Sequence, residues 1–148
     1  MKVAVAKETF PGETRVALIP ATVPSLTKAG LEVGVESQAG LAAGYPDEQF
    51  AEKGATILDS RDEVFAADVV LHVRTAGANP EAFRDDVPRT RAGQVLIGMA
   101  DPLGQPQITA EFAETGASLF ALELLPRITR AQSMDVLSSM ATIAGYRA

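Results

Sequence analysis

Apolar and polar positions follow two different periods along the chain, and this predicts strands separated by helices. Short apolar runs rich in β-branched residues predict strands at residues 3–6, 31–35, 55–58, 68–73, 93–97 and 117–122. Segments with helical spacing lie between them, at residues 21–29, 47–53, 60–65 and 107–115. The run at 68–73 is almost continuously apolar, which is typical of a strand covered on both faces in a parallel sheet.

Strands that alternate with helices predict an α/β fold. The simplest arrangement is a doubly wound, mostly parallel sheet with a flavodoxin-like or Rossmann-like layout. Residues 75–91 hold glycine, prolines and several charges, so we expect a surface excursion with one short helix there. No G-x-G-x-x-G follows any predicted strand, so the usual cradle for a dinucleotide pyrophosphate is missing.

The last predicted helix, from about residue 131 to 148, has two contrasting faces. Its apolar face would carry Val136, Leu137, Met140, Ile143 and Ala144. Its other face would carry short donors and acceptors, Gln132, Asp135, Ser138 and Thr142. Such side chains suit a hydroxylated or amide-bearing small molecule. An ordinary amphipathic helix with a small-residue face packed on another element would give the same pattern.

Composition narrows the function classes. The 148 residues suffice for one domain, 47% of them are apolar, and the formal net charge is −6. Because no lysine or arginine cluster stands out, we expect no nucleic acid or anionic membrane as a direct partner. There is no cysteine and only one histidine, so no metal site is expected. No secretory leader or membrane-spanning run is apparent, which favours an intracellular protein.

Two separated motifs resemble a known family. Residues 7–17 read KETFPGETRVA, and residues 127–139 read RITRAQSMDVLSS. The first resembles a signature shared by alanine dehydrogenases and the alpha subunits of proton-translocating nicotinamide nucleotide transhydrogenases. The second is similar to the NAD-binding stretch of the transhydrogenase alpha subunits. The resemblance spans nearly the whole chain.

The resemblance to transhydrogenase alpha subunits implies hydride transfer from NADH to NADP+, coupled to proton translocation in a larger complex. The chain, 1–148, would be the N-terminal α/β domain of the NAD(H)-binding component, and a second dinucleotide-binding domain would lie outside it. The chain alone would then be inactive. Implied partners are a second alpha subunit, an NADP(H)-binding beta component and membrane segments. The location would be cytoplasmic and peripheral to the membrane.

The resemblance also implies roles for four residues. Arg127 would contact the nicotinamide carboxamide region, and Gln132 would orient the nicotinamide ribose and the nucleotide brought by the partner. Asp135 and Ser138 would fix the carboxamide and the ring orientation, so that Gln132 and Asp135 serve catalysis directly. Asp135 has an alternative role as a carboxylate favoured at the start of a helix.

An alanine dehydrogenase-like oxidoreductase is the nearest competing function. There, the resemblance implies that Arg15 holds a keto-acid carboxylate, which suits its bidentate guanidinium. Those enzymes have a lysine where this chain has Arg74, and a catalytic histidine near the position of Asp101. The one histidine here, His72, lies inside a predicted strand, where we expect a structural role.

The missing histidine matters because an amino-acid dehydrogenase needs a proton donor and acceptor that works near neutral pH. Direct hydride transfer between two nicotinamides needs none, because no proton is exchanged with the protein. Two other possibilities stay open. Lys7, Glu8, Glu13 and Arg15 could simply form a salt-bridge network that rigidifies a loop, and the chain could be a non-catalytic assembly module.

Overall fold

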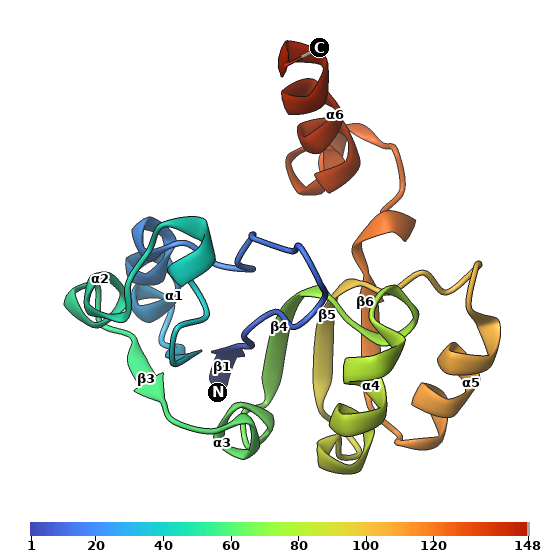
Figure 1. Cartoon of the computed structure of the whole chain (residues 1–148), viewed down its shortest axis with the longest axis horizontal. Helices are drawn as coiled ribbons and strands as arrows, with labels where there is room; N and C mark the ends of the chain where they lie inside the picture. The colour runs from blue at the N-terminus through green and yellow to red at the C-terminus, as the bar shows by residue number, and fades with distance from the viewer. Residues whose placement is uncertain (148) are drawn as a thin grey trace.

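The computed structural model describes residues 1–147, in which six parallel strands form one sheet (Figure 1). The strands are β1 (Lys2–Val5), β2 (Glu32–Glu36), β3 (Thr56–Leu58), β4 (Val69–Arg74), β5 (Val95–Met99) and β6 (Ser118–Ala121). All six coincide with predicted strands to within about two residues at each end.

Six α-helices and six short 3-10 helices connect and follow these strands. The α-helices are α1 (Val23–Lys28), α2 (Asp47–Glu52), α3 (Arg61–Phe65), α4 (Pro80–Asp86), α5 (Pro106–Glu114) and α6 (Val136–Arg147). The 3-10 helices are η1 (Pro20–Thr22), η2 (Leu41–Ala43), η3 (Ala76–Ala78), η4 (Val87–Arg89), η5 (Leu122–Leu124) and η6 (Thr129–Met134). Ser60 caps α3, because its Oγ accepts the N–H of Glu63 at 3.3 Å.

The strand order is β3-β2-β1-β4-β5-β6, which is the Rossmann-like member of the two predicted layouts and not the flavodoxin-like one. Successive strands are added outward in one direction from β1 to β3 and in the opposite direction from β4 to β6, so the order of the strands reverses between the neighbours β1 and β4. Open α/β sheets place ligands beyond the carboxyl ends of their strands. We therefore expect a ligand-binding site among the loops that follow the carboxyl ends of β1, β4, β5 and β6.

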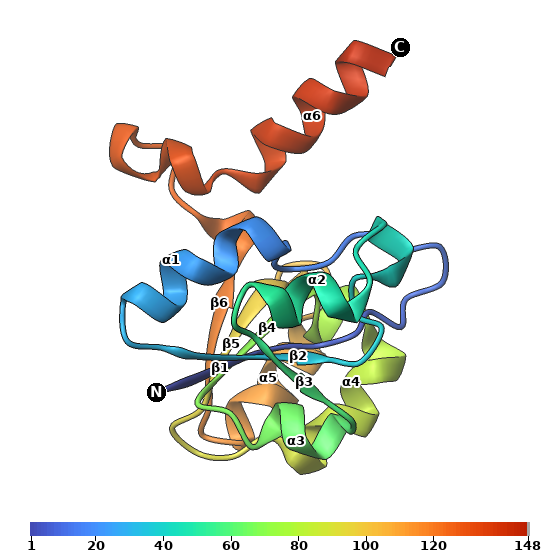
Figure 2. The same ribbon diagram turned by 90° about the vertical axis from the view of Figure 1, so that its left-hand side faces the viewer.

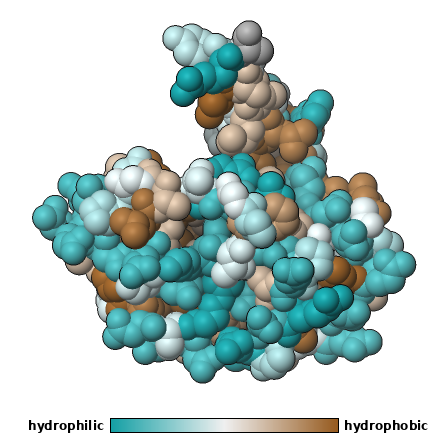
Figure 3. All heavy atoms as spheres, viewed as in Figure 1, coloured by the Kyte–Doolittle hydropathy of each residue, from teal (hydrophilic) through white to brown (hydrophobic). Residues whose placement is uncertain are grey.

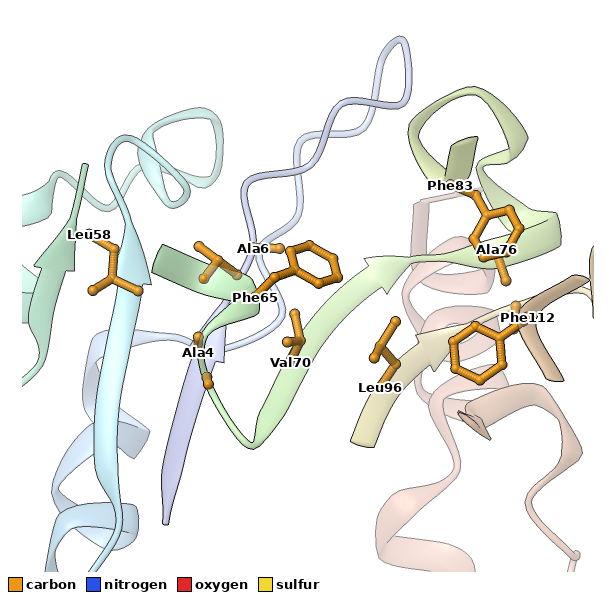
Figure 4. Close-up of a cluster of buried hydrophobic side chains, with 12 residues drawn as sticks. Ala4, Ala6, Leu58, Phe65, Val70, Ala76, Phe83, Leu96 and Phe112 are labelled. Atoms are coloured by element: carbon orange, nitrogen blue, oxygen red, sulfur yellow. The ribbon is translucent and has the colours of Figure 1, made fainter. Parts of the chain in front are cut away.

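Helices cover both faces of the sheet (Figure 2). On one face α1 and α2 pack over a buried cluster that includes Val5, Val23, Val35 and Phe50. On the other face α3, α4 and α5 pack over a second cluster (Figure 4). The helices on the first face do not reach β6, where Phe120 is 59% exposed.

Residues 75–91 contain one α-helix, as predicted, but they are not only a surface excursion. Phe83 of α4 is buried, and its ring centroid lies 6.3 Å from that of Phe112 on α5. Phe83 therefore belongs to the core beneath β4 and β5 (Figure 4). A periodic pattern needs several apolar positions, and here a single buried aromatic residue lies among prolines and charged residues. The sequence pattern therefore gave no sign that this residue belongs to the core.

The prediction of one helix from residue 131 onward is wrong at its start. Thr129–Met134 form η6, and α6 begins only at Val136. From there α6 projects away from the sheet (Figures 1 and 3). Within the described residues its predicted apolar face is largely open, because Leu137 is 50% and Ile143 58% exposed. None of the helices in residues 1–147 is long and apolar enough to cross a membrane.

A buried side-chain amide links two segments at the amino-terminal edge of the sheet, opposite the carboxyl ends of the strands. Gln94 lies just before β5 and is fully buried, and its Nε2 donates to the carbonyls of Phe65 and Ala67 at 2.9 and 2.8 Å. Arg91 donates to the same two carbonyls at 3.0 and 2.8 Å. The carbonyls at the end of α3 are thus satisfied by side chains that also set the start of β5.

We expect Gln94→Leu to lower the free energy of unfolding by about 1–3 kcal/mol, because it removes buried hydrogen bonds and leaves only Arg91 on the carbonyls. Urea unfolding followed by circular dichroism measures this loss. The matched control is Gln49→Leu, since Gln49 is exposed on α2. An equal effect of the two substitutions would contradict the structural role of Gln94.

Candidate functional site

All four predicted site residues line one hollow beyond the carboxyl end of β6. The hollow has a volume of about 430 Å³ and is bordered by Pro126, Arg127, Ala131, Gln132, Asp135 and Ser138. Arg127, Gln132 and Ser138 are exposed, whereas Ala131 is buried and fixes the base of the segment. The hollow therefore offers a guanidinium, an amide, a carboxylate and a hydroxyl to one small molecule.

Asp135 is oriented by the helix that it starts. Its Oδ1 accepts the N–H of Ser138 at 3.0 Å, and its Oδ2 accepts the Ser138 hydroxyl at 2.6 Å. The two hydrogen bonds from Ser138 hold the pKa of Asp135 below its usual value, with a weaker contribution from the charge of Arg127. Asp135 is thus ionised near neutrality, and its remaining lone pairs can accept hydrogen bonds from a ligand.

The same cap explains why the helix starts later than predicted. An aspartate side chain that bonds the N–H three residues ahead favours a helix start, and it competes with continuation of a helix through its own position. Gln132 consequently lies in η6 and not on the α6 face. Gln132, Asp135 and Ser138 still meet at the hollow, but Thr142 does not border it and donates its hydroxyl to the carbonyl of Ser138 at 2.9 Å.

A second hollow of about 300 Å³ lies beside the first one. It is walled by the carboxyl ends of β4 and β5, the loop around Arg15, and the start of α6. Its lining is mixed, with Arg15 and Ser139 among apolar side chains such as Met99 and Met140. Asp135 borders both hollows, so the two hollows are adjacent and share this carboxylate as a common wall.

Arg15 is already paired inside the protein. Its Nε and Nη2 donate to the two carboxylate oxygens of Glu13 at 2.7 and 2.6 Å, and Arg74 Nε donates to Glu13 Oε2 at 2.9 Å. Arg74 also lies over the ring of Phe10, 4.4 Å from the centroid. The hydrogen bonds from Arg15, followed by that from Arg74, lower the pKa of Glu13 to about 2.

The predicted local network is therefore present in a different form. Lys7 is outside it, because its backbone N–H donates to Glu36 at 2.7 Å and its Nζ to Gln38 at 3.1 Å. Glu8 accepts the backbone N–H groups of Val73 and Arg74 at 2.7 and 3.1 Å. Burial raises the pKa of Glu8, against the opposing effect of these two hydrogen bonds.

His72 is buried in β4 and also borders the second hollow, so its structural role stays a prediction. It is 4% exposed, with its ring centroid 6.1 Å from that of Phe65 on α3. Burial lowers the pKa of His72 to about 3, so the imidazole is neutral near pH 7. Asp101, at the position considered for a catalytic histidine, is exposed, and its Oδ1 accepts the N–H of Gly104 at 3.2 Å.

Sequence reasoning missed Glu123. Its Oε1 accepts the N–H groups of Ala100, at 2.8 Å, and of Asp101, both just beyond β5. The only signal in the sequence was a lone carboxylate between Leu122 and Leu124, shortly before Pro126.

Comparison with known proteins gives a consistent result. Residues 4–144 match the family described as "Alanine dehydrogenase/PNT, N-terminal domain". The chain is 43% identical to the NAD(P) transhydrogenase subunit alpha of Cereibacter sphaeroides over 149 aligned residues, covering 100% of this chain and 27% of that protein. It is 30% identical to alanine dehydrogenase 1 of Staphylococcus aureus strain Mu50, covering 99% of this chain and 37% of that protein.

A solved structure is similar over the whole chain as well. The crystal structure of transhydrogenase from Sinorhizobium meliloti superposes with a TM-score of 0.91 at 40% identity, covering 100% of this chain and 42% of that chain. The chain thus spans well under half the length of each of these relatives.

Glu13→Gln should make the stability of the fold less sensitive to acid. The ionised Glu13 stabilises the folded state above its ordinary pKa of 4.5, and this contribution disappears as the pH falls towards the folded value of about 2. The free energy of unfolding of the variant should therefore lie below that of the original chain near neutrality and approach it in acid. Urea unfolding across this pH range tests the expectation, with the exposed Glu48→Gln as control. A difference that stays constant with pH would contradict it.

Proposed function

The chain belongs to the alanine dehydrogenase/PNT N-terminal domain family, and we propose that it forms the N-terminal part of the NAD(H)-binding component of an NAD(P) transhydrogenase. The proposed reaction is hydride transfer from NADH to NADP+, coupled to proton translocation in the full complex. The observation that carries the proposal is the meeting of Arg127, Gln132, Asp135 and Ser138 at one hollow.

The donor set of this hollow fits a nicotinamide. A nicotinamide carboxamide has one carbonyl acceptor and one NH2 donor group. Arg127 and Gln132 can donate to the carbonyl or to ribose oxygens, and Asp135, which is held ionised, can accept from the NH2 group. When bound, NADH would supply the hydride. The residues of the chain would bind the cofactor, fix the ring orientation and exclude water.

The same residues supply no proton donor or acceptor suited to neutral pH. The one histidine of the chain is buried with a pKa of about 3, and Asp135 is held ionised by Ser138. This supports a reaction in which hydride passes directly between two nicotinamides, since such a transfer needs orientation and no proton exchange with the protein.

The proposed partners come from the resemblance to transhydrogenase alpha subunits, and the openness of the hollow is consistent with them. Gln132 and Ser138 are exposed, so the described residues form one wall of a cofactor cleft. We expect a second dinucleotide-binding domain to grip the rest of NAD, and an NADP(H)-binding beta component to meet Gln132. Residues 1–148 alone would then bind NAD weakly and be inactive. A homodimer of the alpha subunit, joined to membrane segments through its partners, would place the protein at the cytoplasmic surface of a membrane.

One observation favours a second candidate, an alanine dehydrogenase-like oxidoreductase. Arg15 borders the second hollow and lies next to Asp135, where a keto-acid carboxylate could meet a guanidinium. That carboxylate would have to compete with Glu13, which already accepts two hydrogen bonds from the Arg15 guanidinium. A non-catalytic assembly module is the third possibility.

The deciding experiment measures hydride transfer from NADH to an NADP analogue by the full-length protein mixed with an NADP-binding component. A pyruvate and ammonia assay runs beside it. Transfer without pyruvate activity supports the transhydrogenase proposal. Pyruvate activity without transfer would overturn it and make Arg15 and Arg74 the residues to test, and no activity in either assay would favour the assembly module.

Asp135→Asn should lower the rate of hydride transfer by about 10- to 100-fold while the fold persists. Asparagine caps helices about as well as aspartate, so this substitution removes the charge and keeps α6. The kcat of the reconstituted enzyme and the helical circular dichroism signal are measured together. Normal turnover would mean that Asp135 acts only as the cap of α6.

Arg127→Ala should raise the KM for NADH and lower kcat, because it removes the guanidinium that borders the hollow. Arg130→Ala is the matched control, since Arg130 is equally exposed but does not border the hollow. Similar kinetic effects of the two substitutions would show that only the general positive charge of the segment matters.

A further inference from the structure

The segment that carries the candidate site has little packing of its own. In residues 126–138 only Ala131 is buried, and Arg127, Gln132 and Ser138 are exposed. Its place relative to the sheet is therefore set by how the chain enters it. That entry is η5, the single turn between β6 and Pro126.

Glu123, in the middle of η5, connects this turn to the neighbouring strand. Its Oε1 accepts the N–H of Ala100 at 2.8 Å and also the N–H of Asp101. Both groups follow the last residue of β5, where the sheet offers them no further partner. Hydrogen bonds from backbone N–H groups to a carboxylate are about twice as strong as those to a neutral acceptor.

The backbone of the β5 loop is shaped for this contact. Asp101 has φ +46°, in the left-handed region that residues other than glycine seldom adopt. Consecutive N–H groups next to such a residue can converge and form a concavity that binds an anionic oxygen. Glu123 occupies this concavity from a position 22 residues further along the chain.

The other carboxylate oxygen of Glu123 reveals how tightly the side chain is enclosed. Glu123 Oε2 is buried and has no hydrogen-bond partner among the described residues. A side chain enclosed in this way suits a role in fixing one geometry.

We propose that Glu123 is a positioning residue, which fixes the segment 126–138 against the end of β5 so that the candidate site has a defined place over the sheet. This inference rests on the proposed hydride transfer for its catalytic consequence. The positioning itself is a property of the chain and can be measured without turnover.

The test compares Glu123→Ala, Glu123→Gln and a control, Glu111→Ala, in the full-length protein. Glu111 is exposed on α5. One measurement is amide hydrogen exchange at residues 100–101 and 127–135, and another is kcat and KM for NADH in the reconstituted enzyme. We expect Glu123→Ala to speed exchange at both places about tenfold or more. It should lower kcat by about 10- to 100-fold, with a smaller change in KM, because misplacement by about 1 Å has this effect.

Glu123→Gln keeps the shape and one carbonyl acceptor, so it should recover most of the rate and show intermediate exchange. If Glu123→Ala does not fold, the glutamine variant decides. In this variant, amide exchange must be faster at residues 127–135 while the exchange rates of the sheet strands are unchanged. A uniform rise in exchange across the sheet in either variant, or a kcat of Glu123→Ala equal to that of the control, would overturn the positioning role. If the unmodified protein transfers no hydride but exchange depends on Glu123, the proposed function fails while the positioning is supported.

Discussion

At the carboxyl ends of the parallel strands, or just beyond them, some backbone N–H groups have no partner in the sheet, and in this chain carboxylate side chains accept their hydrogen bonds. The pairs of carboxylate and N–H residues are Glu36 with Lys7, Asp47 with Gln38, Glu8 with Val73 and Arg74, and Glu123 with Ala100 and Asp101. These bonds tie the loops after β1, β2 and β5, and the end of β4, to other parts of the chain. Part of the acidic composition is therefore structural and serves the edge on which the candidate site lies.

Three ionisable groups at this edge keep a constant charge near neutral pH. Glu13 is paired with two guanidiniums and keeps a pKa of about 2, while Asp135 is held ionised by Ser138. His72 is neutral and buried. None of these three groups changes its charge near pH 7. Their constancy favours chemistry in which the protein supplies position and fixed dipoles, which is also the way the proposed function uses them.

The sequence predicted the strands well because each is a local apolar run. It pointed to the segment of the candidate site because Arg127 and Asp135 lie within one short motif that carries the family resemblance, and the roles of these residues stay predictions. Several features were beyond it for physical reasons. The choice between the two sheet orders depends on where the crossovers pass, which periodicity does not encode. The late start of α6 follows from a side-chain hydrogen bond of Asp135. The role of Glu123 depends on a contact with the β5 loop, far away along the chain.

Arg15 and Arg74 share the single carboxylate of Glu13, so this group of three side chains carries one net positive charge, while the ionised Asp135 at the second hollow carries a negative one, in a chain whose formal net charge is −6. The two guanidiniums reduce the repulsion that the acidic chain exerts on an approaching anion, so approach from the side of Arg15 and Arg74 is favoured before contact. This preference weakens as dissolved salt shortens the screening length from about 10 Å at 0.1 M to about 3 Å at 1 M. The acidity of the chain thus affects how fast and from where an anionic molecule reaches the strand ends, long before any hydrogen bond forms.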